Sequence, residues 1–151
     1  MTTRMSTLAK TVGLVALVAA VIGAPDAAAQ AKPQAAPAAR VRIVEPTDGS
    51  TVTGTSVHVR LEAQGVEIAP AAEHRAGTAH HHLFLDTDVT PADAAIPAGT
   101  PGIIHLGKGQ TEYTFEGVAP GPHRLIAVLA DPNHVPLTPW AVDTVRFTVK
   151  P

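Results

Sequence analysis

The chain has 151 residues, the size of one domain, and 11 Lys and Arg residues stand against 13 Asp and Glu residues. The formal net charge of −2 excludes a protein that binds nucleic acid through a strongly basic surface. There are no cysteines, which excludes disulfide bonds and a catalytic cysteine.

The first 29 residues have the pattern of a secretory signal peptide. Arg4 and Lys10 precede an uncharged apolar stretch over residues 11–24, and Ala27 and Ala29 form an Ala-x-Ala cleavage site. The apolar stretch is shorter than the roughly 20 residues of a transmembrane helix, so an uncleaved anchor is the less favoured alternative. We therefore predict cleavage after Ala29, a periplasmic or secreted protein, and no stable membrane insertion after cleavage.

Residues 30–39 (QAKPQAAPAA) are rich in Ala, Pro and Gln and predict a flexible or polyproline-like linker. The folded domain is expected to span residues 40–151. A domain of about 110 residues buries enough apolar surface to fold without disulfide bonds.

From residue 40 onward, apolar residues at every second position indicate short β-strands. A nearly continuous apolar segment, HRLIAVLAD, predicts a central strand, and residues 69–76 and 91–95 are each expected to form a helical turn at most. Short strands separated by Pro and Gly predict an all-β fold, an antiparallel immunoglobulin-like β-sandwich. The predicted strands are RVRIVEP, SVHVRLEA, HHHLFLD, QTEYTFEGV, HRLIAVLAD and DTVRFTVK.

Three consecutive histidines open the third predicted strand. Side chains alternate along a strand, so His80 and His82 share one face, opposite His81 and the core-facing Leu83 and Leu85. Two imidazoles at this spacing can bind one metal ion, and imidazole suits Zn, Cu, Ni and Fe. The pattern predicts a transition-metal site on His80 and His82, with zinc or copper as the expected cofactor.

Such a site needs at least one more ligand from elsewhere in the chain. We expect His105 or His134, both in predicted loops, to complete it, and Asp86 is a further candidate. Whether these residues reach the histidine pair depends on the strand order, which the periodicity leaves open. The other candidates of suitable chemistry are His123, Asp88 and Asp131.

The histidines also allow readings without a metal. His81 and His123 are in phase with core residues and are expected to be buried, neutral and bonded to the backbone, while His58 and His74 are expected in solvent or in a loop. The alternative is therefore a structural or protein-interaction domain with purely structural histidines. A pH-responsive cluster is another possibility, because imidazole titrates near neutral pH. A hydrolytic metalloenzyme would need an open metal position and a base such as Asp86.

Two loops resemble known ligand-binding motifs but lack essential residues. GIIHLGKG (102–109) resembles part of a phosphate-binding loop, but Gly109 stands where Ser or Thr is needed, so a turn is expected. DTDVTPAD (86–93) resembles a calcium loop but lacks its central Gly and closing Glu. Ser50 and Ser56 lie on no nucleophile elbow, and no enzymatic activity is predicted.

Three stretches in this order resemble a family of small exported bacterial domains, the domain of unknown function 4399. They are GTAHHHLFLD, IIHLGKGQTE and PGPHRLIAVLADPNHVP, and the resemblance covers about residues 77–149. It implies a β-sandwich and no particular activity or protein partner. The sequence departs from the pattern at Ala79, where Gly is expected, and at Leu137, where a further His is expected. If the family uses that histidine as a ligand, this protein would bind metal weakly or not at all.

Overall fold

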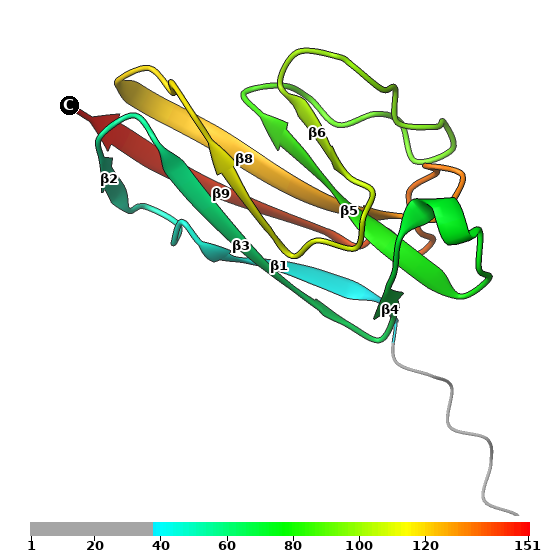
Figure 1. Cartoon of the computed structure of the whole chain (residues 1–151). Helices are drawn as coiled ribbons and strands as arrows, with labels where there is room; N and C mark the ends of the chain where they lie inside the picture. The colour runs from blue at the N-terminus through cyan, green and yellow to red at the C-terminus, as the bar shows by residue number, and fades with distance from the viewer. Residues whose placement is uncertain (1–37) are drawn as a thin grey trace, which may run out of the picture. The chain divides into compact units, whose positions relative to one another are not determined.

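The computed structural model describes residues 38–151, so the predicted signal peptide and all but two residues of the predicted linker lie outside the described part. Two β-sheets pack face to face (Figure 1). The elements, in chain order, are β1 (Arg40–Glu45), β2 (Thr51–Thr53), β3 (Val57–Gln64), β4 (Glu67–Ile68), the 3₁₀ turn η1 (Ala71–Glu73), β5 (Thr78–Leu85), β6 (Ile103–Leu106), β7 (Glu112–Phe115), β8 (Gly121–Ala130) and β9 (Val142–Lys150).

The smaller sheet has the strand order β1-β3-β7, and the larger has the order β2-β9-β8-β5-β4, with β6 also paired to β5. All pairs are antiparallel except two short ones, β2 with β9 and β4 with β5. The predicted immunoglobulin-like β-sandwich is confirmed, with these two parallel pairs as an addition. As predicted, the strand HRLIAVLAD (β8) is central, since it lies between β9 and β5.

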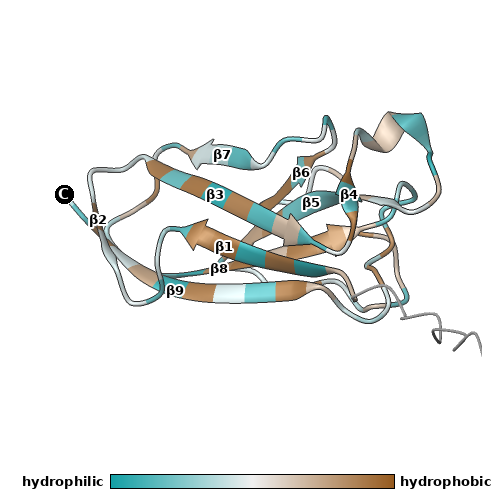
Figure 2. Ribbon diagram, turned by 90° about the horizontal axis from the view of Figure 1, so that it is seen from below, coloured by the Kyte–Doolittle hydropathy of each residue, from teal (hydrophilic) through white to brown (hydrophobic). Residues whose placement is uncertain are grey.

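The main core lies between the two sheets and follows the predicted alternation. Val57, Val59 and Leu61 of β3 are at most 3% exposed, and they pack with apolar residues of β5, β8 and β9. Figure 2 shows the same alternation as bands of hydrophobic and hydrophilic residues along β1 and β3. This regular pattern fixes which face of each strand is turned away from the core.

The larger sheet is also covered on its outer face. Phe84 from β5 and Ile126 from β8 pack there against Ile96 and Val89 from the segment between β5 and β6. This explains why the second half of β8 is buried at every position. The outer face of β5, which carries His80 and His82, therefore belongs partly to the interior.

Three short strands were not predicted. β2 and β4 lie in segments where no strand is predicted, and β6 lies in GIIHLGKG, which is expected to be a turn. β2 and β4, of three and two residues, are too short to show a period, and β6 lacks alternation because Ile103 and Ile104 are adjacent. All three exist because a longer neighbour pairs with them. The helical turn expected in residues 69–76 is present as η1, whereas residues 91–95 form a turn closed by a 3.1 Å bond from Ala94 N–H to the Pro91 carbonyl.

Candidate metal centre

Four histidines from three separate segments meet on the outer face of the larger sheet. His80 and His82 come from β5, and His105 comes from β6, where it lies directly opposite His82 in the antiparallel register. His134 follows β8, whose last residue, Ala130, pairs with His80. The structure thus brings four of the five predicted ligands together, and one nitrogen from each ring lies within 4.8 Å of the others.

The loop after β8 is shaped to return His134 to this group. The Asp131 carboxylate accepts hydrogen bonds from the backbone N–H groups of Asn133 (2.8 Å) and Val135 (3.0 Å). The backbone N–H of His134 donates to the Asp131 carbonyl, and His134 adopts a left-handed conformation with φ of 68°. Asp131 therefore acts on the site through the backbone of the His134 loop.

Gly107 makes room for the His105 ring. A Cβ atom at this glycine would lie 2.2 Å from Cε1 and 2.4 Å from Nε2 of His105. Since real Cβ atoms do not approach other atoms so closely, the ring occupies the volume that any other residue would fill. Gly107 has no positive φ, so its role is this close approach.

The four rings are close to one another. Nε2 of His105 lies 3.2 Å from Nε2 of His134, and the ring centres are 4.7 to 5.7 Å apart for the six possible pairs. Two nitrogens bound to one zinc ion at about 2.0–2.1 Å are at most about 4.2 Å apart. Because the four candidate donor nitrogens lie within 4.8 Å of one another, a small approach of the rings suffices for one ion.

Burial keeps the inner rings neutral. His80 and His82 are 0% and 1% exposed. Burial, with further contributions from neighbouring histidines, lowers the pKa of His80 to about 4 and the pKa of His82 to about 2. Burial also lowers the pKa of His105. At neutral pH these rings therefore offer lone pairs, which is the protonation state that a metal ligand needs.

Three buried nitrogens of this group lack a hydrogen-bond partner among residues 38–151. They are both ring nitrogens of His80 and Nδ1 of His82. An unsatisfied buried polar group costs about 1–3 kcal/mol, so a polar ligand or ion would relieve this cost. His81, on the core side of the strand, has a partner for one of its ring nitrogens, because its Nδ1 lies 3.2 Å from the Gln110 carbonyl.

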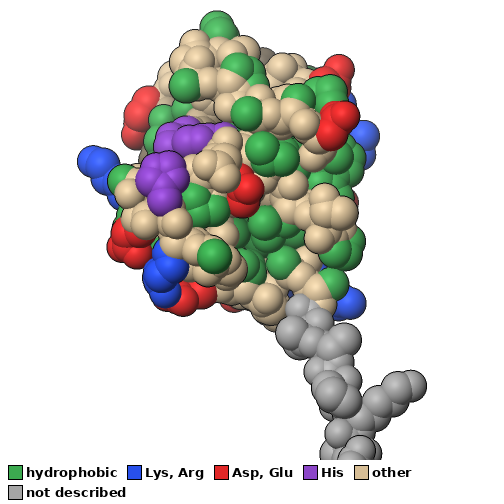
Figure 3. All heavy atoms as spheres, turned by 90° about the vertical axis from the view of Figure 1, so that its right-hand side faces the viewer, with side chains coloured by type: hydrophobic (Ala, Val, Ile, Leu, Met, Phe, Trp, Pro, Cys, Tyr) green, Lys and Arg blue, Asp and Glu red, His purple; other side chains and the backbone are tan. Residues whose placement is uncertain are grey.

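The group is open to solvent on one side. His105 is exposed and His134 is partly exposed, whereas the rings on β5 lie beneath them. Figure 3 shows histidine side chains at the surface of the face that it draws, with acidic and hydrophobic side chains near them. An ion can therefore reach the buried rings from solvent past His105 and His134.

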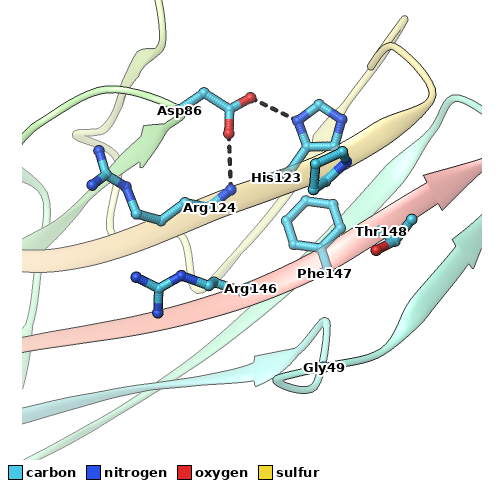
Figure 4. Close-up of a pocket in the computed structure, with 8 residues that line it drawn as sticks. Gly49, Asp86, His123, Arg124, Arg146, Phe147 and Thr148 are labelled. Atoms are coloured by element: carbon cyan, nitrogen blue, oxygen red, sulfur yellow. Dashed lines mark hydrogen bonds and ion pairs between the residues drawn. The ribbon is translucent and has the colours of Figure 1, made fainter.

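The structure does not bring Asp86, the fifth predicted ligand, into this group. Asp86 follows β5 with a left-handed φ of 55°, and its carboxylate accepts bonds from His123 Nδ1 (2.6 Å) and the Arg124 backbone N–H (2.8 Å) (Figure 4). Four residues along a strand span about 13 Å, so Asp86 lies too far along β5 from His82 to share one ion. Asp88 is also engaged elsewhere, in a 2.7 Å ion pair with Arg124.

His123 bonds to the backbone as predicted, but its surroundings favour the protonated ring over the predicted neutral one. Nδ1 faces the Asp86 carboxylate, and Nε2 faces the Ala119 carbonyl at 2.7 Å. A carboxylate and a carbonyl both accept hydrogen bonds, so the ring can donate to both partners only when both of its nitrogens carry a proton. Burial lowers the pKa of His123, but the bonds to Asp86 and Ala119 and the charge of Asp86 outweigh it and raise the pKa.

The remaining histidines lie as predicted. His81 is fully buried on the core side of β5, and burial lowers its pKa despite the bond to Gln110. His58 and His74 are exposed, His58 on the outer face of β3 and His74 just after η1. None of these three belongs to the four-histidine group.

Comparison with known proteins adds a family and distant structural similarity. The family described as Domain of unknown function (DUF4399) matches residues 59–150. No curated protein matches the chain. None of the helical structure in residues 38–151 has the length and apolar character needed to cross a membrane.

Three solved structures illustrate the structural similarity, each with a TM-score below 0.5. An engineered protein has 12% identity and a TM-score of 0.48 over 78% of this chain, which spans only 21% of that protein. Fibronectin(III)-like modules of Clostridium thermocellum CbhA have 15% identity and a TM-score of 0.43, over 73% of this chain and 95% of theirs. The extracellular domain of a putative hybrid two component system, BT3049 of B. thetaiotaomicron, has 14% identity and a TM-score of 0.43, over 73% of this chain and 12% of its own.

Proposed function

The chain belongs to the DUF4399 family, and because that description names no activity, we propose from the four-histidine group alone that the protein binds a transition-metal ion, zinc or copper. The ligands in this proposal are His80, His82, His105 and His134. The protein is exported by its signal peptide and acts in the periplasm or outside the cell as a non-enzymatic binding module.

The observation that carries the proposal is the convergence of four imidazoles with unpartnered, buried nitrogens. Residues far apart in the sequence contribute nitrogens that all lie within 4.8 Å of one another. Two of the rings are fully buried and neutral, and metal binding would satisfy nitrogens that have no partner among the described residues. Imidazole ligands without thiolates or carboxylates are typical of sites for borderline ions such as Zn²⁺ and Cu²⁺.

The alternative of purely structural histidines accounts less well for the same rings. A structural histidine in a core is expected to bond to the backbone, as His81 does with Gln110. Both nitrogens of His80 are buried without such a partner. A hydrolytic role is also less favoured, because Asp86, the base that such a role would need, is bonded to His123 and Arg124.

Thermal unfolding of the untagged chain tests this proposal. After chelation, Zn²⁺ or Cu²⁺ at about 100 times its dissociation constant is expected to stabilise the protein by about 2.7 kcal/mol, a shift of several degrees. The shift should be lost in His105→Ala, which removes an exposed ligand and should leave the fold intact. It should persist in His58→Ala, which removes an exposed histidine outside the group. A dissociation constant of about 100 µM is the weak limit for a useful site. If about 100 µM of either ion causes no shift in the unmodified chain, metal binding is refuted.

A further inference from the structure

We infer that the four-histidine group is a tetrahedral site, closed by its four imidazoles, for an ion with a filled d shell, either Zn²⁺ or Cu⁺. This inference rests on the proposed metal binding and goes beyond it. It identifies the coordination geometry, the number of ligands and the electronic class of the ion.

The centres of the four rings cannot lie in one plane. For any four points in a plane, the largest separation is at least about 1.4 times the smallest, as in the diagonal and edge of a square. The ring centres of His105 and His134 are 4.7 Å apart and those of His82 and His134 are 5.7 Å apart, the extremes of the six distances and a ratio of about 1.2. The rings therefore surround a point from four sides, as in a tetrahedron.

The separations of the ring centres also resemble those of an ideal tetrahedral complex. With a metal–nitrogen distance of about 2.05 Å and a ring centre about 1.1 Å beyond the nitrogen, tetrahedral geometry places ring centres about 5.1 Å apart. Square-planar geometry would give about 4.5 Å along the edges and 6.3 Å across the diagonals. The observed values of 4.7 to 5.7 Å cluster around the tetrahedral distance and reach neither extreme of the planar arrangement.

A single contact between donor atoms agrees. Nε2 of His105 and Nε2 of His134 are 3.2 Å apart. Two ligands of a tetrahedral zinc ion are separated by about 3.3 Å, given metal–nitrogen distances of about 2.05 Å. The two outer ligands are thus already at the separation that a bound ion requires.

Ions differ in their preference for this geometry. Zn²⁺ and Cu⁺ have filled d shells and accept tetrahedral sites without an electronic penalty, whereas Cu²⁺ and Ni²⁺ favour square-planar or tetragonal arrangements. Four protein ligands also fill a tetrahedral shell, and a catalytic site would keep one position open for water or substrate. The group is therefore suited to hold an ion, not to activate water.

The absence of the further histidine that the family pattern predicts is consistent with a complete set of four histidine ligands. Leu137 stands where a further histidine was expected, and it packs against the main core. Because His80, His82, His105 and His134 already supply four nitrogens, the missing histidine leaves no gap in a tetrahedral shell. The expectation of weak binding without that histidine is thus not required by the geometry.

Cobalt(II) absorption tests the geometry separately from binding. Co²⁺ added to the chelated, untagged chain should give the intense visible bands of tetrahedral cobalt and should be displaced by one equivalent of Zn²⁺. His134→Asn removes one ligand and keeps a residue that tolerates the left-handed backbone, so its visible absorption should fall several-fold as water enters. Bound cobalt with the weak bands of six-coordinate cobalt would overturn the tetrahedral inference and leave metal binding intact. Failure of Co²⁺, Zn²⁺ and copper ions to bind at all would instead refute the proposed function.

Experiments with copper provide a second test and distinguish Zn²⁺ from Cu⁺. Chelator competition under anaerobic, reducing conditions should show Cu⁺ or Zn²⁺ bound at least tenfold more tightly than Ni²⁺. Whichever of Cu⁺ and Zn²⁺ has the lower dissociation constant is the ion that the site prefers. The electron paramagnetic resonance spectrum of added Cu²⁺ should be that of a tetrahedrally distorted site. A tetragonal Cu²⁺ spectrum together with preferential Ni²⁺ binding would overturn the inference.

Discussion

Gly107 shows how one absent side chain can position a metal ligand. The His105 ring lies where the Cβ of any other residue would be, so Gly107→Ala must displace the ring. We expect this variant to bind Zn²⁺ at least tenfold more weakly. The loss of a residue that supports a ligand lowers metal affinity by a similar factor in other metal sites. Its free energy of unfolding without metal should change by less than about 1 kcal/mol, because Gly107 has no positive φ. Chelator-competition titration checks the prediction, with His105→Ala as the reference for full loss of this ligand, and wild-type affinity in Gly107→Ala would contradict it.

At the scale of elements, Asp86 and His123 tie the end of β5 to the start of β8 and to the loop after β7. His123 is only about a tenth exposed, and its raised pKa reflects the bonds to Asp86 and Ala119. A group whose pKa is raised by folding stabilises the protein fully below its unfolded pKa of about 6.5 and loses this contribution as the pH rises through the folded value. Asp86 and His123 line a surface pocket, and the other charged groups that line it are Arg124 and Arg146 (Figure 4).

Asp86→Asn keeps a residue that tolerates the left-handed φ of 55° but removes the charge, and it should cost about 1–3 kcal/mol at pH 6 and clearly less at pH 9. Urea unfolding at the two pH values measures this, and an NMR titration should show a lower pKa for His123. Asp88→Asn is the matched control, because Asp88 forms only an exposed ion pair with Arg124. An equal loss at both pH values would show that His123 does not carry the effect.

At the scale of the whole molecule, one core joins the two sheets. Leu83 of β5 is fully buried among residues from both sheets. Leu83→Ala should therefore lower the free energy of unfolding by about 2–5 kcal/mol through lost burial and a cavity. Urea unfolding should remain one cooperative transition with an unchanged slope, while Thr144→Ala at an exposed position of β9 should change stability by less than about 1 kcal/mol. Two separate transitions in the Leu83 variant would indicate that the sheets unfold independently.

The longer strands and their faces were predictable because alternation is a local property. Val57, Val59 and Leu61 are buried as the period of two requires, and the apolar run of β8 is central. The strands β2 and β4 were missed because three and two residues are too short to show a period, and β6 was missed because its adjacent Ile103 and Ile104 break the alternation. The outer-face cover over Phe84 was missed for the same reason, because Ile96 and Val89 lie in a segment without periodicity.

The sequence by itself determined that His80 and His82 share one face of a strand, because the alternation of side chains needs no knowledge of the rest of the fold. Only the tertiary structure decided that His105 and His134 join them and that Asp86 does not. His105 arrives through the pairing of β6 with β5, and His134 through the loop held by Asp131. The raised pKa of His123 was also decided there, because it depends on Asp86 and Ala119 being placed at its two nitrogens. Strand order and loop conformation arise from contacts between distant residues, so no local pattern encodes them.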